Sequence, residues 1–456
     1  MATALHTPPH ASRPLTLKGW NPIRTTLAFR HDPLRFLMQL SHECGDLSQW
    51  RLFAWPVYHV NHPEFVKHIL QGNHPNYSKD LNLYKIATPL LGHGLLTSDG
   101  DFWLRQRRLI QPAFHRQKVN GFAQLMTDAT LAMLEQWDAA AKTEQQIDLA
   151  QEMMHLTLRV VALALFSADV SQDAPTFTEA FNRANIFLGK YLSFPFPPLQ
   201  VPTPSHRRFH ADLKTLDDVV YQMIRERRKN KEDKGDLLSM LMSAVDEETA
   251  EGMTDLQLHD EILTLLLAGN ETTAMALAWT WYLLAQHPEV ETRLHSELET
   301  TLAGRVPTLE DLPRLTYTQM VLDETMRLYP PAWFLMRKAI HEDTIGGYTI
   351  PSNAFLSYSA YTLHRHPDFW DNPERFDPER FTPERSESRP RYAYVPFGAG
   401  PRLCIGNQFA LLESQLILAT VAQRYQFALV PGHPVTPEPA LTLRTGSGVV
   451  VSMRRR

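Results

Sequence analysis

One cysteine lies in a loop made largely of glycine, proline and arginine. The stretch FGAGPRLCIG covers residues 397–406 and holds Cys404, one of only two cysteines among 456 residues. Two cysteines are too few for a disulfide framework or for a zinc site built from cysteines alone. A lone cysteine is most often a small buried apolar residue, which is the role we expect for Cys44. The loop by itself leaves the role of Cys404 open.

A second candidate for chemistry is a polar stretch inside an apolar helix. Leu, Ala, Ile and Met dominate residues 254–286, which predicts one helix about 50 Å long that ends at a His-Pro pair. Its centre reads AGNETT, residues 268–273. A carboxylate at the middle of a bilayer would cost a few kcal/mol, so we expect this helix to be buried in the protein rather than to span a membrane.

The polar stretch admits two interpretations. A threonine hydroxyl beside the Glu271 carboxylate can relay protons, and Gly269 can leave space for a flat or small ligand. Alternatively, the threonines hydrogen-bond back to the preceding turn and Gly269 only relieves a close helix crossing. The stretch alone supports the two about equally.

A third feature pairs Glu324 with Arg327 on one face of a helix expected over residues 317–329. Most such pairs are exposed and contribute less than about 1 kcal/mol. Residues 364–381, HRHPDFWDNPERFDPERF, are expected to form a packed irregular segment. Arg375 or Arg380 from this segment could reach a buried carboxylate, which would need a full set of hydrogen bonds.

Helical patterns dominate the rest of the chain, with short strand-like runs toward both ends. The fold class expected is mainly α with small β-sheets (α+β), in which strands distant in sequence pair. We expect a flexible segment over residues 1–20 and a single domain over residues 21–456. Strands are expected at 47–53, 57–60, 355–358, 427–430 and 448–452, long loops at 73–94 and 194–204, and a solvated helix end and loop at 225–236.

Composition excludes several classes of protein. Hydrophobic residues make up 43% of the chain and charged residues 21%, which is typical of a globular protein. A formal net charge of −5 argues against a nucleic-acid partner. The first twenty residues lack an apolar run, so neither a signal peptide nor a transmembrane anchor is expected. The scarcity of cysteine indicates a reducing, cytoplasmic location.

Taken together, these motifs resemble the cytochrome P-450 family of haem-thiolate monooxygenases. The cysteine loop matches the family pattern F-x-x-G-x-R-x-C-x-G at every defined position, and AGNETT matches the family's acidic-threonine motif. ETMR (324–327) matches E-x-x-R, the second PERF (378–381) matches the arginine motif, and WLRQR (103–107) resembles W-x-x-x-R. The motifs follow the family's order over residues 90–425. The resemblance implies a P-450 fold with the long central helix over the haem.

The resemblance also implies a set of roles. Cys404 would be the axial thiolate ligand of the iron in haem b, covered by Phe397, with the N-terminus of a helix near residue 407 close to its sulfur. Glycines at 398, 400 and 406 would allow unusual backbone angles in the loop. Glu271 and Thr272 would deliver protons, and Ala268 would line the haem pocket. Glu324, Arg327 and Arg380 would form a structural triad. The haem propionates would be held by Trp103, Arg107, Arg402 and, from its place after the Pro-Pro turn, Arg337.

The implied reaction is hydroxylation or epoxidation of an apolar substrate such as a fatty acid, a terpenoid or a carotenoid-like chain. Pocket walls are expected from residues 81–90, 194–204 and 331–335 and from Leu265 and Ala268. The partners are O₂ and a separate ferredoxin- or flavodoxin-type electron donor with its reductase, which could dock on Arg105, Arg108, Arg116 and Lys118. Two alternatives remain: the same fold driven by peroxide, and a haem-based gas sensor or electron carrier without catalysis.

Overall fold

The computed structural model describes residues 14–456 except 143–145, 168–174, 194–195 and 231–232. The chain divides into two compact units, and each unit is made of segments that are far apart in sequence. Unit 1 comprises the residues up to Leu81 together with Met326–Asp377 and Thr382–Cys404. Unit 2 comprises Asn82–Thr325, Pro378–Phe381 and Ile405–Arg456. The expectation of one domain over residues 21–456 therefore stays a prediction.

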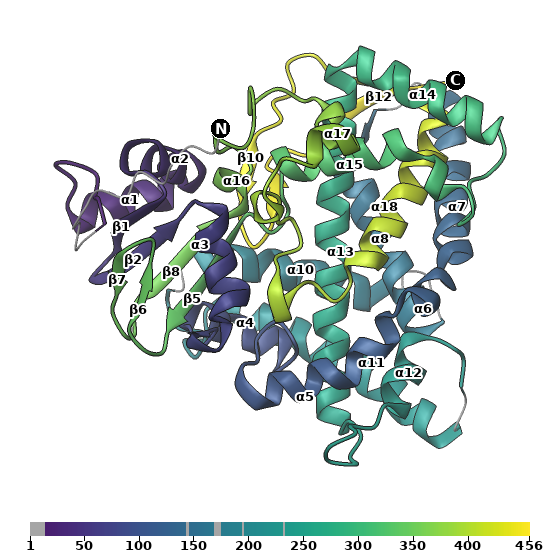
Figure 1. The fold of residues 1–456 in the computed structure, drawn as a ribbon. Coiled ribbons are helices and arrows are strands. Elements are labelled where there is room, and N and C mark those ends of the chain that lie inside the picture. Colours follow the sequence, from purple (N-terminus) through teal and green to yellow (C-terminus); the bar gives the residue numbers. More distant parts are fainter. Residues whose placement is uncertain (1–13, 143–145, 168–174, 194–195, 231–232) are drawn as a thin grey trace. The chain divides into compact units, whose positions relative to one another are not determined.

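Unit 1 is built on a five-stranded sheet with the strand order β1-β2-β8-β5-β3 (Figure 1). Strands β2 and β8 are parallel, and the other neighbours are antiparallel. His59 of β2 pairs with Ser357 of β8, which lies 298 residues further along the chain. The strands are β1 (Leu47–Leu52), β2 (Trp55–Val60), β3 (Tyr77–Ser78), β5 (Phe334–Ala339) and β8 (Phe355–Ser359).

Short helices surround this sheet. Helices α1 (Pro22–His31) and α2 (Pro33–Cys44) precede it, and both begin with proline after a capping side chain, Asn21 or Asp32. Within the expected flexible segment 1–20, residues 1–13 lie outside the described part of the chain, whereas Leu17 is buried. The remaining elements of unit 1 are α3 (Pro63–Lys67), η1 (His68–Gly72), η2 (His74–Asn76), β6 (Asp343–Ile345), β7 (Tyr348–Ile350), α16 (Ala360–Leu363), α17 (Pro383–Ser386), η6 (Arg391–Ala393) and η7 (Gly400–Arg402).

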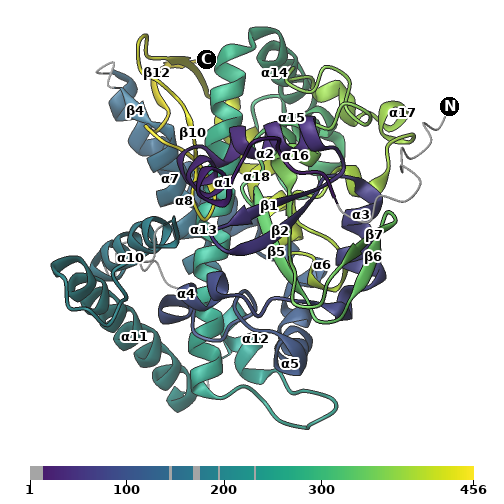
Figure 2. The same ribbon diagram turned by 90° about the vertical axis from the view of Figure 1, so that its left-hand side faces the viewer.

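Unit 2 is helical and centres on α13 (Asp255–Gln286), which runs alongside α8 (Figures 1 and 2). The other helices are α4 (Asn82–Leu91), α5 (Gly100–Ile110), η3 (Gln111–Phe114), α6 (Arg116–Asn120), α7 (Ala123–Lys142), α8 (Leu149–Phe166), α10 (Pro175–Ser193), α11 (Pro204–Asn230), α12 (Leu237–Ser243), α14 (Pro288–Leu302), η4 (Leu312–Arg314), α15 (Thr316–Leu328, of which residues 326–328 belong to unit 1), η5 (Pro378–Phe381) and α18 (Asn407–Ala422). Its strands are β4 (Ile147–Asp148), β9 (Tyr425–Leu429), β10 (Pro437–Pro439), β11 (Leu443–Thr445) and β12 (Val450–Arg455).

The bounds of α13 confirm the long helix expected over residues 254–286. A capping box starts it: the Thr254 hydroxyl accepts from the Gln257 amide, and the Gln257 side chain accepts from the Thr254 amide. His287 and Pro288 end it. Two helices, α8 and α13, are long and apolar enough to cross a membrane, but their most apolar windows are 67% and 83% buried. Both are therefore core helices of unit 2.

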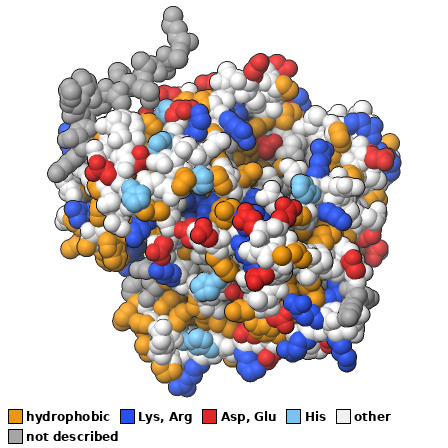
Figure 3. Space-filling model, turned by 60° about the horizontal axis from the view of Figure 1, so that its bottom comes forward, with side chains coloured by type: hydrophobic (Ala, Val, Ile, Leu, Met, Phe, Trp, Pro, Cys, Tyr) orange, Lys and Arg blue, Asp and Glu red, His pale blue; other side chains and the backbone are white. Residues whose placement is uncertain are grey.

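The expected strands are present, with one difference in how they pair. Strand β2 pairs with β8, as expected for segments distant in sequence, and β1 joins the same sheet through β2, but β9 and β12 form a separate sheet with β4 in the order β4-β12-β9. The face shown in Figure 3 carries Asp and Glu side chains close to Lys and Arg side chains. That mixture agrees with the small net charge of the chain.

One expectation about a loop is wrong, and a second is met only in part. Residues 73–94 contain helix α4, because LNLYKIATPLL keeps enough apolar residues to pack and Pro89 falls near the end of the helix. The described residues of 225–236 include the end of α11 at Asn230 and are mostly exposed, as expected. The exceptions are Arg227 and Asp236, which are buried, and Arg227 donates to both Asp236 oxygens at 2.7 and 2.8 Å. Of the expected loop 194–204, residues 194–195 lie outside the described chain, and residues 196–203 contain neither helix nor strand.

Candidate functional site

The cysteine loop closes on itself within unit 1. The Cys404 amide donates to the Phe397 carbonyl at 3.0 Å, and the Leu403 amide donates to the Gly400 carbonyl at 3.0 Å. The turn η7 lies within the segment that these two hydrogen bonds close. The Cys404 side chain, at the end of this segment, is exposed. Helix α18 starts at Asn407, as expected. In sequence, the exposed thiol thus lies three residues before the first residue of a helix.

Gly400 is required by the structure. Its φ is +67°, and a Cβ placed there would lie 1.8 Å from the Leu70 carbonyl oxygen of η1. Gly398 also has a positive φ of +68°, but the nearest atom to its Cβ would be the Tyr358 hydroxyl at 3.9 Å. Gly406 has an ordinary φ of −89°, so the expectation that all three glycines supply unusual angles is wrong for this one.

These two glycines provide a matched test. Both Gly398→Ala and Gly400→Ala should carry left-handed strain of about 1–2 kcal/mol. Only Gly400→Ala also forces the loop away from η1, so we expect it to destabilise the protein by at least about 2 kcal/mol more than Gly398→Ala. Denaturant unfolding measures the difference, and the rate at which a thiol reagent modifies Cys404 reports loop displacement. Equal destabilisation by the two variants would contradict the packing of Gly400 against Leu70.

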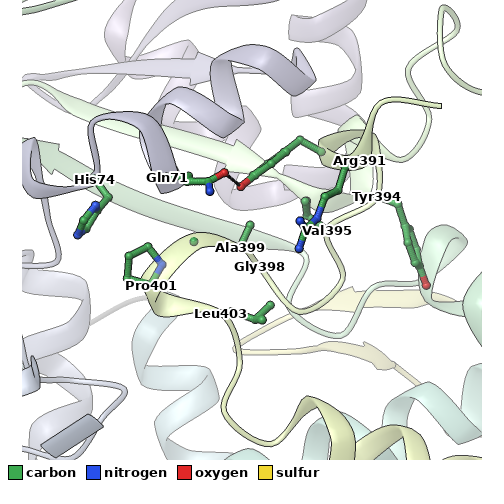
Figure 4. Close-up of a pocket in the computed structure, with 11 residues that line it drawn as sticks. Gln71, His74, Arg391, Tyr394, Val395, Gly398, Ala399, Pro401 and Leu403 are labelled. Carbon is green, nitrogen blue, oxygen red and sulfur yellow. Dashed lines mark hydrogen bonds between the residues drawn. The ribbon is translucent and has the colours of Figure 1, made fainter. Parts of the chain in front are cut away.

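A pocket of about 440 Å³ borders the cysteine loop (Figure 4). The Tyr392 hydroxyl donates to the Gln71 side chain at 2.5 Å in its wall, and His74 lies beside Pro401. A second, smaller cavity is lined by both Arg337 and Arg402. The structure therefore brings together two of the arginines expected to bind propionates, and both belong to unit 1.

A carboxylate that the sequence did not single out anchors this region. Asp343 accepts hydrogen bonds from Tyr77 at 2.5 Å, His68 at 2.8 Å and Asn73 at 2.9 Å. Burial alone would raise the pKa of Asp343, but these hydrogen bonds outweigh it and lower the pKa to about 2. The ionised Asp343 thus holds His68 and Asn73, which lie on either side of Leu70 in the chain. These two hydrogen bonds fix the segment whose Leu70 carbonyl packs against Gly400. Only proximity in the fold reveals Asp343, because its partners lie about 270 residues away.

Helix α13 of unit 2 exposes one small part of its polar stretch. Ala268 is exposed and Thr272 is half-buried, although neighbouring residues on both sides are buried. The Thr272 hydroxyl donates to the Ala268 carbonyl one turn earlier at 2.6 Å. A small residue and a hydroxyl are therefore presented side by side on an otherwise buried helix.

The remainder of the polar stretch faces the protein interior. A Cβ on Gly269 would lie 3.0 Å from Val161 of α8, so this glycine permits a close helix crossing rather than leaving space for a ligand. The Thr157 hydroxyl of α8 donates to the Asn270 side chain at 2.9 Å. Of the two interpretations of Gly269, the structural one is correct.

Glu271 is held by three donors. It is 1% exposed, and its oxygens accept from Thr442 at 2.8 Å, from Asn185 at 3.0 Å and from the Arg444 guanidinium. The carboxylate is thereby joined to α10 and to the β11 segment. Its expected role in proton delivery stays a prediction, and the structure adds a second role, which is to fix these elements on α13.

Trp103 and Arg107 are four residues apart on α5 and therefore share one face. Trp103 is buried and Arg107 half-buried. The expected basic docking patch is reduced, because Arg108 pairs with Asp246 at 3.0 Å and with Glu248 at 2.5 Å, while Arg105 pairs with Glu251 at 3.7 Å. Of the four basic residues expected to form the docking patch, Arg116 and Lys118 are exposed.

The structure confirms that Arg380, not Arg375, contacts Glu324. The Arg380 Nε lies 3.2 Å from Glu324 Oε1, with the two side chains 4% and 0% exposed. Within unit 1, Arg327 donates to the carbonyls of His364 at 2.9 Å, Pro373 at 2.7 Å and Arg375 at 3.1 Å. The buried arginine thus holds the irregular segment 364–381 by its backbone.

Glu413 is another group that sequence reasoning missed. It lies in α18 beside Thr273 of α13 and is 1% exposed. Burial raises its pKa well above the ordinary value, which favours the neutral carboxyl. A single carboxyl in an otherwise apolar helix gives no local sequence signal, and only its burial distinguishes it.

Comparison with known proteins decides the family. The cytochrome P-450 family model matches residues 9–451. The chain is a cytochrome P-450. It is 40% identical over 411 residues to a cyclooctat-9-en-7-ol 5-monooxygenase of Streptomyces melanosporofaciens, covering 89% of this chain and 88% of that protein. It is 33% identical over 406 residues to a pentalenene oxygenase of Streptomyces avermitilis, covering 89% of each.

Solved structures agree with this assignment. The crystal structure of the cytochrome P450DA haem domain matches this P-450 with a TM-score of 0.89 and 29% identity, and the match covers 97% of each chain. The family makes the protein a haem-iron oxidoreductase of the monooxygenase class. The residues present fit a haem: an exposed thiol ends a tight loop, two arginines line one cavity of unit 1, and α13 of unit 2 exposes Ala268.

Proposed function

We propose that Cys404 is the axial ligand of haem b in this P-450 and that the enzyme inserts oxygen into a terpenoid. The exposed thiol at the end of the 397–404 loop carries the proposal, because the only other cysteine, Cys44, is buried. When bound, the haem activates O₂ at its iron, and the thiolate assists cleavage of the O–O bond. Arg337 and Arg402 would pair with propionates, joined by Trp103 and Arg107, and Phe397 would shield the sulfur.

The chain's own residues would supply protons on the α13 side. One oxygen atom enters the substrate and the other leaves as water, so each turnover consumes two protons and two electrons. The half-buried Thr272 carries the accessible hydroxyl of this stretch, and Glu271 lies next to it in sequence. Arg444 and Asn185 would have to release Glu271 before it could exchange protons, so we assign the immediate proton-donating step to Thr272.

A Thr272→Ala variant tests this assignment. We expect the variant to bind substrate with an affinity within about twofold of the parent. Most electrons should be diverted to hydrogen peroxide, because the hydroxyl that donates the proton is gone. Product and peroxide formed per NADPH measure the coupling. Thr280→Ala is a matched control, since Thr280 also bonds back along α13, to Ala276 at 2.7 Å, but is fully buried. Unchanged coupling in Thr272→Ala would remove Thr272 from the relay.

The substrate class rests on the relatives and on the apolar lining expected for the pocket. Two relatives are named for oxidation of cyclooctatenol and pentalenene. The expected wall residue Leu265 is apolar and 8% exposed in α13, one turn before Ala268. We therefore favour a cyclic terpene or terpene alcohol over a fatty acid or a carotenoid-like chain. Electrons would come from a ferredoxin- or flavodoxin-type protein with its reductase in the cytoplasm.

The proposal is tested with purified holoprotein and a panel of terpenes, fatty acids and carotenoids. Terpenes should give the substrate-induced spin shift and, with ferredoxin, reductase and ¹⁸O₂, a product that carries one labelled oxygen. The control omits the reductase. Turnover with hydrogen peroxide alone and none with the redox chain would favour the peroxide-driven alternative. Binding without product from every substrate would favour the sensor or carrier.

A further inference from the structure

Helix α1 of unit 1 packs Phe29 inward but exposes two of its other apolar side chains. Ile23 is 71% and Leu27 57% exposed, whereas Thr25 and Thr26 are only 6% and 3% exposed. A surface helix ordinarily buries its apolar stripe and exposes its polar residues. The reversed pattern leaves Ile23 and Leu27, one turn apart, on the same outer face.

The tip of the β1–β2 hairpin, next to α1, shows the same reversal. Phe53, Ala54 and Trp55 are exposed, with Phe53 at 55% and Trp55 at 52%. Phe53 adopts a φ of +54°, a conformation that favours glycine and asparagine and costs free energy for a bulky side chain. Glycine or asparagine would adopt this conformation at a lower cost in free energy, so the backbone does not require an aromatic residue here.

The two buried threonines join these parts into one surface. The Thr25 hydroxyl donates to the Arg51 carbonyl at 2.7 Å, and the Phe53 amide donates to the Thr26 hydroxyl at 2.7 Å. Figure 2 shows α1 beside β1. The threonines therefore fix α1 to the hairpin tip and hold four exposed apolar side chains on neighbouring elements. We call this surface the α1–hairpin face, made of Ile23, Leu27, Phe53 and Trp55.

Basic side chains accompany the α1–hairpin face. Arg24, Arg30 and Arg51 are exposed, and α1 contains no acidic residue. Arg24 stacks on Trp20 at 4.3 Å, and Arg51 donates to the Ala54 carbonyl at 3.1 Å. The acidic residue that follows α1, Asp32, caps α2 by accepting from the Arg35 amide. Apolar and aromatic side chains mixed with arginine are the composition of helices and turns that lie at an anionic lipid surface.

We propose that the α1–hairpin face docks reversibly on an anionic lipid bilayer. A second copy of the chain is the less favourable occupant, because a symmetric dimer through this face would bring the same arginines together across the two-fold axis. Anionic headgroups neutralise those arginines while Ile23, Leu27, Phe53 and Trp55 enter the boundary between headgroups and acyl chains. This docking needs neither haem nor electron transfer.

Flotation with unilamellar vesicles tests the proposal on the full-length holoprotein. Vesicles of phosphatidylcholine with about 30% phosphatidylglycerol should bind the protein, and neutral phosphatidylcholine vesicles should bind it several-fold less. Ile23→Ser combined with Leu27→Ser should weaken binding about tenfold. The matched control, Val245→Ser with Leu256→Ser, changes two residues of unit 2 that are each 59% exposed and should leave binding unchanged.

Phe53→Gly separates docking from folding. Because glycine tolerates the φ of this position, the variant should keep or raise the unfolding temperature while it weakens vesicle binding. A lower unfolding temperature with unchanged binding would show that Phe53 serves the fold and would overturn its part in docking. Absence of binding to anionic vesicles would overturn the proposal, as would a dimer in light scattering that the Ile23→Ser, Leu27→Ser variant abolishes.

Discussion

A Cys404→Ser variant is expected to lose the strongly red-shifted Soret band that the reduced, CO-treated parent protein should give. The band would require a thiolate ligand from the protein, and a serine hydroxyl does not ionise near neutral pH. Monooxygenase activity should fall by at least about 10³-fold, because O–O cleavage loses the electron donation from sulfur. The CO difference spectrum and product formation with the redox chain measure the two effects.

Cys44→Ser provides the control. Cys44 is buried at the end of α2, and burial, helped by the Glu43 carboxylate, raises the pKa of its thiol. The thiol therefore stays protonated and packs as an apolar group, so its replacement should cost some stability but leave the band in place. If Cys404→Ser kept the red-shifted band, or if Cys44→Ser lost it while folded, the ligand assignment would be wrong.

Glu324→Ala is expected to destabilise unit 2 by about 3–5 kcal/mol, because it leaves the Arg380 guanidinium buried without its carboxylate. Denaturant unfolding of the holoprotein measures this loss. Replacing both residues with apolar ones, Glu324→Met and Arg380→Leu, should recover much of it, since the buried Arg380 charge is then removed together with its carboxylate. The pair thus matters for stability mainly because removal of one partner alone leaves the other charge buried without its partner.

An exposed ion pair gives the comparison. Lys214 and Asp218 lie 2.6 Å apart on α11 with 75% and 66% of their side chains exposed. Lys214→Ala should therefore change stability by less than about 1 kcal/mol. If Glu324→Ala costs no more than Lys214→Ala, the buried pair is not a structural requirement, and the E-x-x-R motif would need another explanation.

Sequence reasoning succeeded where the feature depends on the local sequence or on a family motif. The α13 bounds followed from a run of Leu, Ala, Ile and Met and a terminal His-Pro pair, and the pairing of Glu324 with Arg380 followed from the family motif. Sequence reasoning failed where the role or conformation of a residue depends on how other parts of the chain pack around it. Gly269 could not be assigned without Val161, and Gly406 was misjudged because its φ depends on how the loop enters α18.

Missed residues share a physical reason. Asp343 and Glu413 matter because of burial and of partners on other elements, and neither property leaves a local pattern. Helix α4 was missed because Pro89 outweighed its apolar residues in a local reading, although a proline near the end of a helix removes few backbone hydrogen bonds. Long-range packing decided each of these cases.

The parallel pairing of β2 with β8 has a consequence for biosynthesis. At about 5–20 residues per second, the ribosome releases β8 roughly 15–60 s after β2. During that interval the β1–β2 hairpin has a bare edge that can pair with other nascent chains. We infer that the demand for chaperones during translation falls on the first sixty residues, and that slowing translation after this point would lower the yield of folded protein.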